Sequence, residues 1–164
     1  MRVQQKTRLK AKSPLKAKTS LRSSSGTKKS SKKQSVSSLK KKADKLWSQY
    51  IRLRDSNSNG IGECITCGVQ KPWKQGQCGH FISRSCNLLR YDEENTNFQC
   101  YSCNVMNHGE QYQYAINLDL KYGAGTATKL HKQRNTPHQF TVDELLEVIH
   151  DANVYLEHYS IDIA

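Results

Sequence analysis

This 164-residue sequence lacks long hydrophobic runs, and its N-terminal part has almost no acidic residues. No apolar run approaches the roughly 20 residues that span a bilayer. The positively charged N-terminus is not followed by the apolar segment of a secretory signal. Hydrophobic residues make up only 35% of the chain and aromatic residues 8%. These absences predict a cytoplasmic protein that does not enter a membrane.

Charge is divided unevenly along the chain. Residues 1–45 contain 16 Lys or Arg and one acid, a net charge of +15, whereas residues 46–164 have a net charge of −3. Residues 1–36 are mostly Lys, Arg, Ser, Thr and Gln, a composition that cannot bury enough apolar surface to offset its ordering entropy. We expect a disordered basic tail over residues 1–36 that contacts nucleic-acid phosphates. A tail that only solubilises the protein is the alternative. Residues 37–164 are expected to form a single domain.

The first folded segment shows the periodicity of an amphipathic helix. Apolar residues recur at steps of three and four from Leu39 to Leu53, which predicts a helix with one apolar face. Ser37 or Ser38 is expected to cap it, and the polar, glycine-containing stretch 57–62 to end it. We expect this face to pack against a core; a basic helix that lies on DNA is the alternative.

The C-terminal segment, residues 136–164, has six acids and no Lys or Arg. Thr141 and Glu144 have the spacing of a capping box, and an apolar stripe follows them from Val142 to Tyr159. We therefore expect an acidic C-terminal helix that packs against the core. A dimer contact or a docking face for another protein is the alternative.

Four of the six cysteines form two CxxC pairs, Cys64 with Cys67 and Cys100 with Cys103, with 32 residues between the pairs. Two residues between cysteines allow both thiolates to reach one tetrahedral ion from a tight turn. Two such turns predict a structural zinc site that joins two distant segments of a small domain.

Disulfides are the competing interpretation of the cysteines. They are disfavoured because nothing in the sequence indicates secretion. The two remaining cysteines, Cys78 and Cys86, are expected to stay outside the zinc site, although Cys78 could replace one ligand.

The residues around and between the CxxC pairs form an ordered set of motifs. They read CITCG, CGHFISR and LRYDEENTNFQCYSCN, with the less specific YGAGTATKL further on. This set resembles the HNH (ββα-metal, or His-Me finger) nucleases. It is most similar to the lambda NinG (Rap) family of phage recombination endonucleases, over roughly residues 40–155.

The resemblance implies a phosphodiesterase site. His80 matches the general base at the end of the first strand, and a neutral imidazole can take a proton from water near pH 7. Asn95 matches the residue that fixes the loop and helps to orient that imidazole. Asn104 matches a ligand of the catalytic metal, for which Mg²⁺ or Mn²⁺ is expected.

One position departs from the resembled pattern. Many relatives have an Asp or His just before the general base, and that residue also binds the metal, but here the position is Gly79. His108 is a candidate to complete the metal site. Four acids elsewhere are alternatives: Asp92, Glu93, Glu94 and Glu110.

Two arginines, Arg84 and Arg90, flank the expected site. Each is a candidate to bind DNA phosphates, or else to pair with the acidic run 92–94.

A helix is expected after the second CxxC pair, with Gly123 as its C-cap. Its core-facing residues are predicted to be Tyr112, Ile116 and Leu120.

These observations predict an α+β fold: a small zinc-stapled, HNH-like ββα-metal domain surrounded by helices. The expected function is metal-dependent cleavage of DNA. The resemblance alone implies branched or junction DNA as substrate, and a phage gene acting in the bacterial cytoplasm. A homodimer is compatible with cutting two strands. A non-catalytic zinc module that binds nucleic acid, and an assembly factor that docks a protein through its C-terminal helix, are the alternatives.

Overall fold

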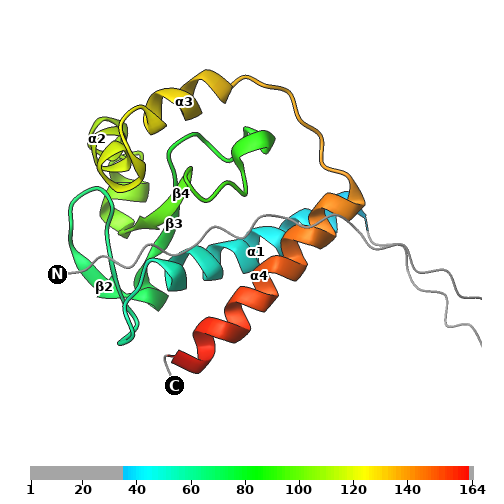
Figure 1. Cartoon of the computed structure of the whole chain (residues 1–164), viewed down its shortest axis with the longest axis horizontal. Helices are drawn as coiled ribbons and strands as arrows, with labels where there is room; N and C mark the ends of the chain where they lie inside the picture. Colours follow the sequence, from blue (N-terminus) through cyan, green and yellow to red (C-terminus); the bar gives the residue numbers. More distant parts are fainter. Residues whose placement is uncertain (1–34, 163–164) are drawn as a thin grey trace, which may run out of the picture. The chain divides into compact units, whose positions relative to one another are not determined.

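The computed structural model describes residues 35–162, which form a mixed α+β fold with a helix at each end (Figure 1). The predicted tail, residues 1–36, lies almost entirely outside this part of the chain. Over the described residues, none of the helices has the length and apolar character needed to cross a membrane. The elements in chain order are α1 (Val36–Arg54), β1 (Ile61–Glu63), β2 (Gln70–Pro72), the 3-10 helix η1 (Trp73–Gln75), β3 (Gln77–His80), the 3-10 helix η2 (Asn87–Leu89), β4 (Thr96–Gln99), the π-helix η3 (Ser102–Met106), α2 (Gln111–Tyr122), α3 (Thr126–Gln133) and α4 (Val142–Asp162).

Helix α1 confirms the first predicted helix but begins slightly earlier. Ser35 is the N-cap, and its hydroxyl oxygen accepts a hydrogen bond of 3.2 Å from the backbone N–H of Ser38. The expectation that Ser37 or Ser38 caps the helix is therefore wrong, because both lie inside its first turn. The predicted apolar face is buried; its fully buried members are Leu39, Ala43, Trp47, Tyr50, Ile51 and Leu53.

Helix α4 confirms the predicted capping box. The Thr141 hydroxyl oxygen accepts from the Glu144 backbone N–H at 3.2 Å, and the Glu144 carboxylate accepts from the Thr141 backbone N–H at 2.7 Å. The helix lies beside α1 (Figure 1). Leu145 and Ile149 pack on the first half of α1, and Tyr155 stacks on Tyr50 in its second half. Because Leu145 and Ile149 are covered by α1, they form a packing face.

The strands form two antiparallel hairpins. In the first, Ile61 pairs with Pro72, and the connecting turn contains the first CxxC pair. In the second, His80 pairs with Thr96 and Gln77 with Gln99. All four residues of β4 are buried, so this strand runs through the interior and delivers the second CxxC pair directly after it.

Helices α2 and α3 cover the second hairpin (Figure 1). Gly123 ends α2 with φ of +112°, which confirms the predicted C-cap. The predicted core face of α2 is wrong, because Tyr112 is 81% exposed and Leu120 79% exposed, with Ile116 also exposed at 40%. The buried residues of α2 are instead Tyr114 and Leu118.

Packing against the strands explains this choice of face. The Tyr114 hydroxyl donates to the Gly79 carbonyl at 3.1 Å and accepts from the Asn97 side chain at 3.4 Å. Tyr114 and Leu118 join a core with Phe81 from the loop after β3. The stripe that contains Tyr112 and the stripe that contains Tyr114 both have helical spacing. Only the contacts of Tyr114 with the strands determine which stripe is buried.

Candidate metal centre and active-site cleft

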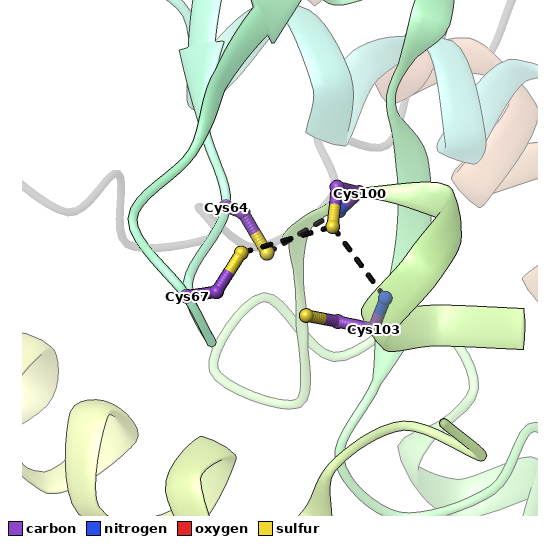
Figure 2. Close-up of side chains that lie close together, drawn as sticks. All are labelled: Cys64, Cys67, Cys100 and Cys103. Atoms are coloured by element: carbon purple, nitrogen blue, oxygen red, sulfur yellow. Dashed lines mark hydrogen bonds between the residues drawn. The ribbon is translucent and has the colours of Figure 1, made fainter. Parts of the chain in front are cut away.

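The four cysteines of the CxxC pairs converge on one point (Figure 2). Cys64 and Cys67 come from the turn between β1 and β2, and Cys100 and Cys103 follow β4. Their sulfur atoms all lie within 4.8 Å of one another. The cluster therefore connects the first hairpin to the second, as the spacing predicted.

The geometry of the cluster fits zinc. A tetrahedral site with Zn–S bonds of about 2.3 Å places sulfur atoms about 3.8 Å apart, and the Cys67 and Cys100 sulfurs are 3.8 Å apart. The Cys100 backbone N–H donates to the Cys64 sulfur at 3.3 Å, which favours a thiolate there. Burial opposes this effect, but the backbone hydrogen bonds outweigh it and lower the pKa of Cys64. These residues would hold a structural Zn²⁺.

The other two cysteines are not part of this cluster. Cys78 lies on β3 and Cys86 in the connection between β3 and β4. Burial raises the pKa of Cys78 to about 12, so this thiol stays protonated. Cys86 is buried and Cys78 half-buried, and both lie outside the four-cysteine cluster, in agreement with the expectation.

A cleft of about 850 Å³ lies where β3, the turn after the second CxxC pair, α1 and α3 meet. Five of the six candidate residues other than the cysteines line it: His80, Arg84, Arg90, Asn104 and His108. The sixth, Asn95, is fully buried beside it. Candidates that are up to 28 positions apart in the sequence thus line one cleft.

His80 is the last residue of β3 and faces this cleft. Its Nε2 lies 3.2 Å from the Arg90 carbonyl oxygen. A carbonyl oxygen can only accept, so Nε2 carries the hydrogen in the neutral ring and Nδ1 keeps its lone pair. Burial, helped by the positive charges of Arg90 and Arg84, lowers the pKa of His80 despite opposing contacts with the Arg90 and Cys78 backbone. The imidazole is therefore neutral near pH 7.

Asn95 fixes the connection between the two strands of the second hairpin. Its side-chain oxygen accepts from the Ile82 backbone N–H at 2.6 Å, and its amide nitrogen donates to the Ile82 and Leu89 carbonyls at 2.9 Å each. It makes no hydrogen bond to the His80 ring. Its effect on that ring passes through the backbone, since Ile82 and Leu89 lie close in sequence to His80 and to its partner Arg90.

The two arginines predicted to bind phosphate differ in their partners. The Arg90 guanidinium makes two hydrogen bonds to the Asp44 carboxylate, at 2.7 and 2.6 Å. Hydrogen bonds from Arg90 and Tyr91 outweigh burial and lower the pKa of Asp44, so the pair is charged on both sides. Arg84 is exposed and pairs with no carboxylate among the described residues. Of the two arginines, Arg84 is therefore the one that is available to bind a phosphate, because Arg90 is paired with Asp44.

Gly79 is explained by the packing of the residue that faces it. A Cβ atom at this position would lie 2.3 Å from the side-chain oxygen of Gln99, far inside van der Waals contact. Gln99 is fully buried, and its amide nitrogen donates to Thr66 at 2.7 Å and to the Gly109 carbonyl at 2.9 Å. The space that a metal-binding side chain would occupy at this position is therefore filled by Gln99.

The acids considered as substitutes for the missing carboxylate do not line the cleft. The Asp92 carboxylate accepts from the Asn95 backbone at 2.8 Å, and the Glu93 carboxylate from the Tyr50 hydroxyl at 2.8 Å. Glu94 pairs with Lys129 at 2.7 Å. Asp92, Glu93 and Glu94 are thus engaged in contacts within the fold, and of the residues predicted to bind the catalytic metal, Asn104 and His108 line the cleft.

Comparison with known proteins places the chain in a family. The family model described as "Bacteriophage Lambda NinG protein" matches residues 1–159. The chain belongs to the NinG family. It is 30% identical over 105 residues to the ninG protein of Escherichia phage 933W, and 28% identical over the same length to those of Escherichia phage lambda and Salmonella phage P22.

The matched segment covers 63% of this chain and 48–49% of those relatives. The chain thus spans about half the length of the curated NinG proteins that it matches. No solved structure matches the chain.

Sequence reasoning on this NinG-family chain missed the part of the cleft that comes from α3. His131, Arg134 and Asn135, at the C-terminal end of that helix, line the cleft with the predicted residues. The available signal was the basic cluster over residues 129–134, just beyond the predicted C-cap at Gly123. A basic cluster of this kind indicates that these residues are exposed, but it does not indicate that they lie next to His80.

Proposed function

We propose that this NinG-family protein is a metal-dependent DNA endonuclease of the HNH type. The observation that carries the proposal is that His80, Asn104 and His108 line one cleft, although His80 ends a strand, Asn104 lies on the short π-helix Ser102–Met106 and His108 on the turn that follows it. The order of β3, β4 and the helical segment after Cys103 agrees with a ββα-metal element. Branched DNA as the preferred substrate is implied by the resemblance of the sequence.

His80 acts as the general base in this proposal. Its Nδ1 lone pair takes a proton from the attacking water, while the Nε2 hydrogen bond to the Arg90 carbonyl fixes the ring. Asn95 is a positioning residue, because it holds the Leu89 carbonyl next to that partner. Arg84, which has no carboxylate partner among the described residues, binds the phosphate.

The donor chemistry of the cleft fits a Mg²⁺ or Mn²⁺ ion bound largely through substrate. Mg²⁺ is commonly held by one or two protein groups, several waters and a phosphate. Asn104 offers an amide oxygen and His108 an imidazole, and these two residues would hold the ion. When bound, such an ion would neutralise charge on the phosphate and on the leaving oxygen.

The test is cleavage of linear duplex, single-stranded and four-way-junction DNA by zinc-loaded protein, with Mg²⁺, with Mn²⁺ and without added metal. Omitting the divalent ion is preferable to adding EDTA, which would also attack the cysteine cluster. We expect cleavage that requires the added ion and falls by about 10²- to 10⁴-fold in His80→Ala. His150→Ala, an exposed histidine on α4, is the matched control and should cut normally.

Either of two results would refute this assignment. If zinc-loaded protein binds all three substrates and cuts none, the protein is a non-catalytic zinc-containing binding module. If folded His80→Ala cuts as fast as the parent, the base lies elsewhere. Zinc content and thermal melting of each variant show that the fold is intact.

A further inference from the structure

The C-terminal end of α3 is held firmly against the connection between β3 and β4. Leu130 of α3 is fully buried in the core that also contains Phe81 and Leu89. The Cys86 thiol lies 3.9 Å from the Gln133 carbonyl oxygen, and the Asn87 amide donates to the His138 carbonyl at 2.8 Å. The segment that follows α3 is therefore fixed relative to the cleft, together with the side chains it projects.

This end of α3 adds a cation to the cleft that no described carboxylate compensates. Asp44 is the only acid among the described residues that line the cleft, and the Arg90 guanidinium occupies it. Arg134 is exposed, and its guanidinium contacts the His131 ring. Within the described residues, neither Arg134 nor Arg84 forms a salt bridge. Two guanidinium groups from different segments thus line one cleft, and neither is paired with a carboxylate among the described residues.

We propose that Arg134, supported by His131, binds a second backbone phosphate of the DNA strand whose scissile phosphate lies at His80. A guanidinium presents paired N–H donors that match phosphate oxygens. A cleft of about 850 Å³ has the volume of sites that hold ligands of many atoms, which suits a stretch of strand. The identity of the ligand rests on the proposed nuclease function. Arg134 binds the substrate in this scheme, and His80 remains the base.

The structure provides a matched control in the last turn of α3, directly before Arg134 at its C-cap. Lys132 is exposed and basic like Arg134, lies two residues away, and does not line the cleft. Arg134→Gln and Lys132→Gln therefore remove the same charge from the same region of the protein. A purely long-range effect of net charge would change both variants alike, whereas a phosphate contact in the cleft would affect Arg134→Gln alone.

Binding of a fluorescein-labelled four-way junction to the full zinc-loaded chain, without Mg²⁺ and over a series of salt concentrations, measures the contact. We expect Arg134→Gln to weaken binding by about 5- to 30-fold and to reduce the slope of log K against log salt by about one. Lys132→Gln should change affinity by less than about twofold. With Mg²⁺, Arg134→Gln should raise KM by a larger factor than it lowers kcat.

Equal effects of the two substitutions, or no effect of Arg134→Gln, would overturn the inference, as would a parent protein that does not bind the junction. Failure of the Arg134 proposal can be distinguished from failure of the nuclease proposal. If nothing is cut but Arg134→Gln still weakens binding selectively, the nuclease assignment fails and the phosphate contact stands. If His80-dependent cutting occurs while the two variants bind alike, the phosphate contact alone is wrong.

Discussion

Gly79→Ala tests whether the close packing of Gln99 explains why the residue before His80 is a glycine. The new Cβ atom would lie 2.3 Å from the Gln99 side-chain oxygen and 2.9 Å from its Cβ atom. To make room, Gln99 would have to leave its hydrogen bonds to Thr66 and to the Gly109 carbonyl.

The expected cost follows from these two consequences. Overpacking in a tight interior costs about 1–3 kcal/mol, and two lost hydrogen bonds cost about 0.5–1.5 kcal/mol each. We therefore expect Gly79→Ala to lower the free energy of unfolding by about 2–6 kcal/mol. The measurement is urea unfolding of zinc-loaded protein, followed by far-UV circular dichroism.

A double-mutant cycle isolates the contact. Combining Gly79→Ala with Gln99→Ala removes the 2.3 Å contact with the side-chain oxygen and leaves only the 2.9 Å contact between the two Cβ atoms, so the pair should cost about 1–3 kcal/mol less than the sum of the single substitutions. Gly123→Ala is the control, because this glycine has φ of +112° and no atom within 4 Å of its added Cβ. Its cost should be backbone strain alone and should add to that of Gln99→Ala. A Gly79→Ala protein within about 0.5 kcal/mol of the parent would refute the packing explanation.

Three further predictions concern the metal cluster, the C-terminal helix and the proposed base. The parent protein should bind one zinc ion per chain by atomic emission, and Cys103→Ser should lose zinc and melt at a markedly lower temperature; unchanged melting would contradict a structural role. Thr141→Ala should cost about 1 kcal/mol in urea unfolding because it removes the cap that pairs with Glu144, and a neutral result would show that this cap contributes nothing. The pKa of His80 is lowered, so the imidazole should stay neutral at pH values somewhat below 6.5, the ordinary pKa of histidine being about 6.5. In a plot of cleavage rate against pH, the midpoint of the acid limb should therefore lie below about 6.5. The positive charge of Arg84 contributes to the lowered pKa of His80. Arg84→Gln should therefore move the midpoint of the acid limb to higher pH; an unchanged midpoint would show that Arg84 does not affect the pKa of His80.

The sequence carried enough information for the parts of the fold whose signals are local. The four-cysteine cluster is predictable because CxxC spacing restricts the ligand geometry, and α4 because Thr141 and Glu144 pair within one helical turn. His80, Asn104 and His108 were placed together through the ordered motifs, and they do line one cleft.

The rest depends on contacts between distant segments. The buried face of α2 was predicted wrongly because Tyr112 and Tyr114 both belong to helically spaced apolar stripes, and the Gly79 carbonyl selects Tyr114. The Arg90 partner was not predicted, because Asp44 lies 46 positions away on α1. Arg134 was missed for the same reason: only the packing of α3 on the β3–β4 connection brings it to the cleft.

The pairing of α1 with α4 sets the order in which the domain can be completed during synthesis. The two helices run in the same direction, with Leu39 near Leu145 and Tyr50 near Tyr155, so their contacts join residues about 100 positions apart. At about 5–20 residues per second, α4 leaves the ribosome roughly 5–20 s after α1. The four cysteines are all synthesised within that interval, which allows the metal centre to close first. Until α4 arrives, the apolar face of α1 remains uncovered, and this is the period in which a nascent chain is most exposed to aggregation.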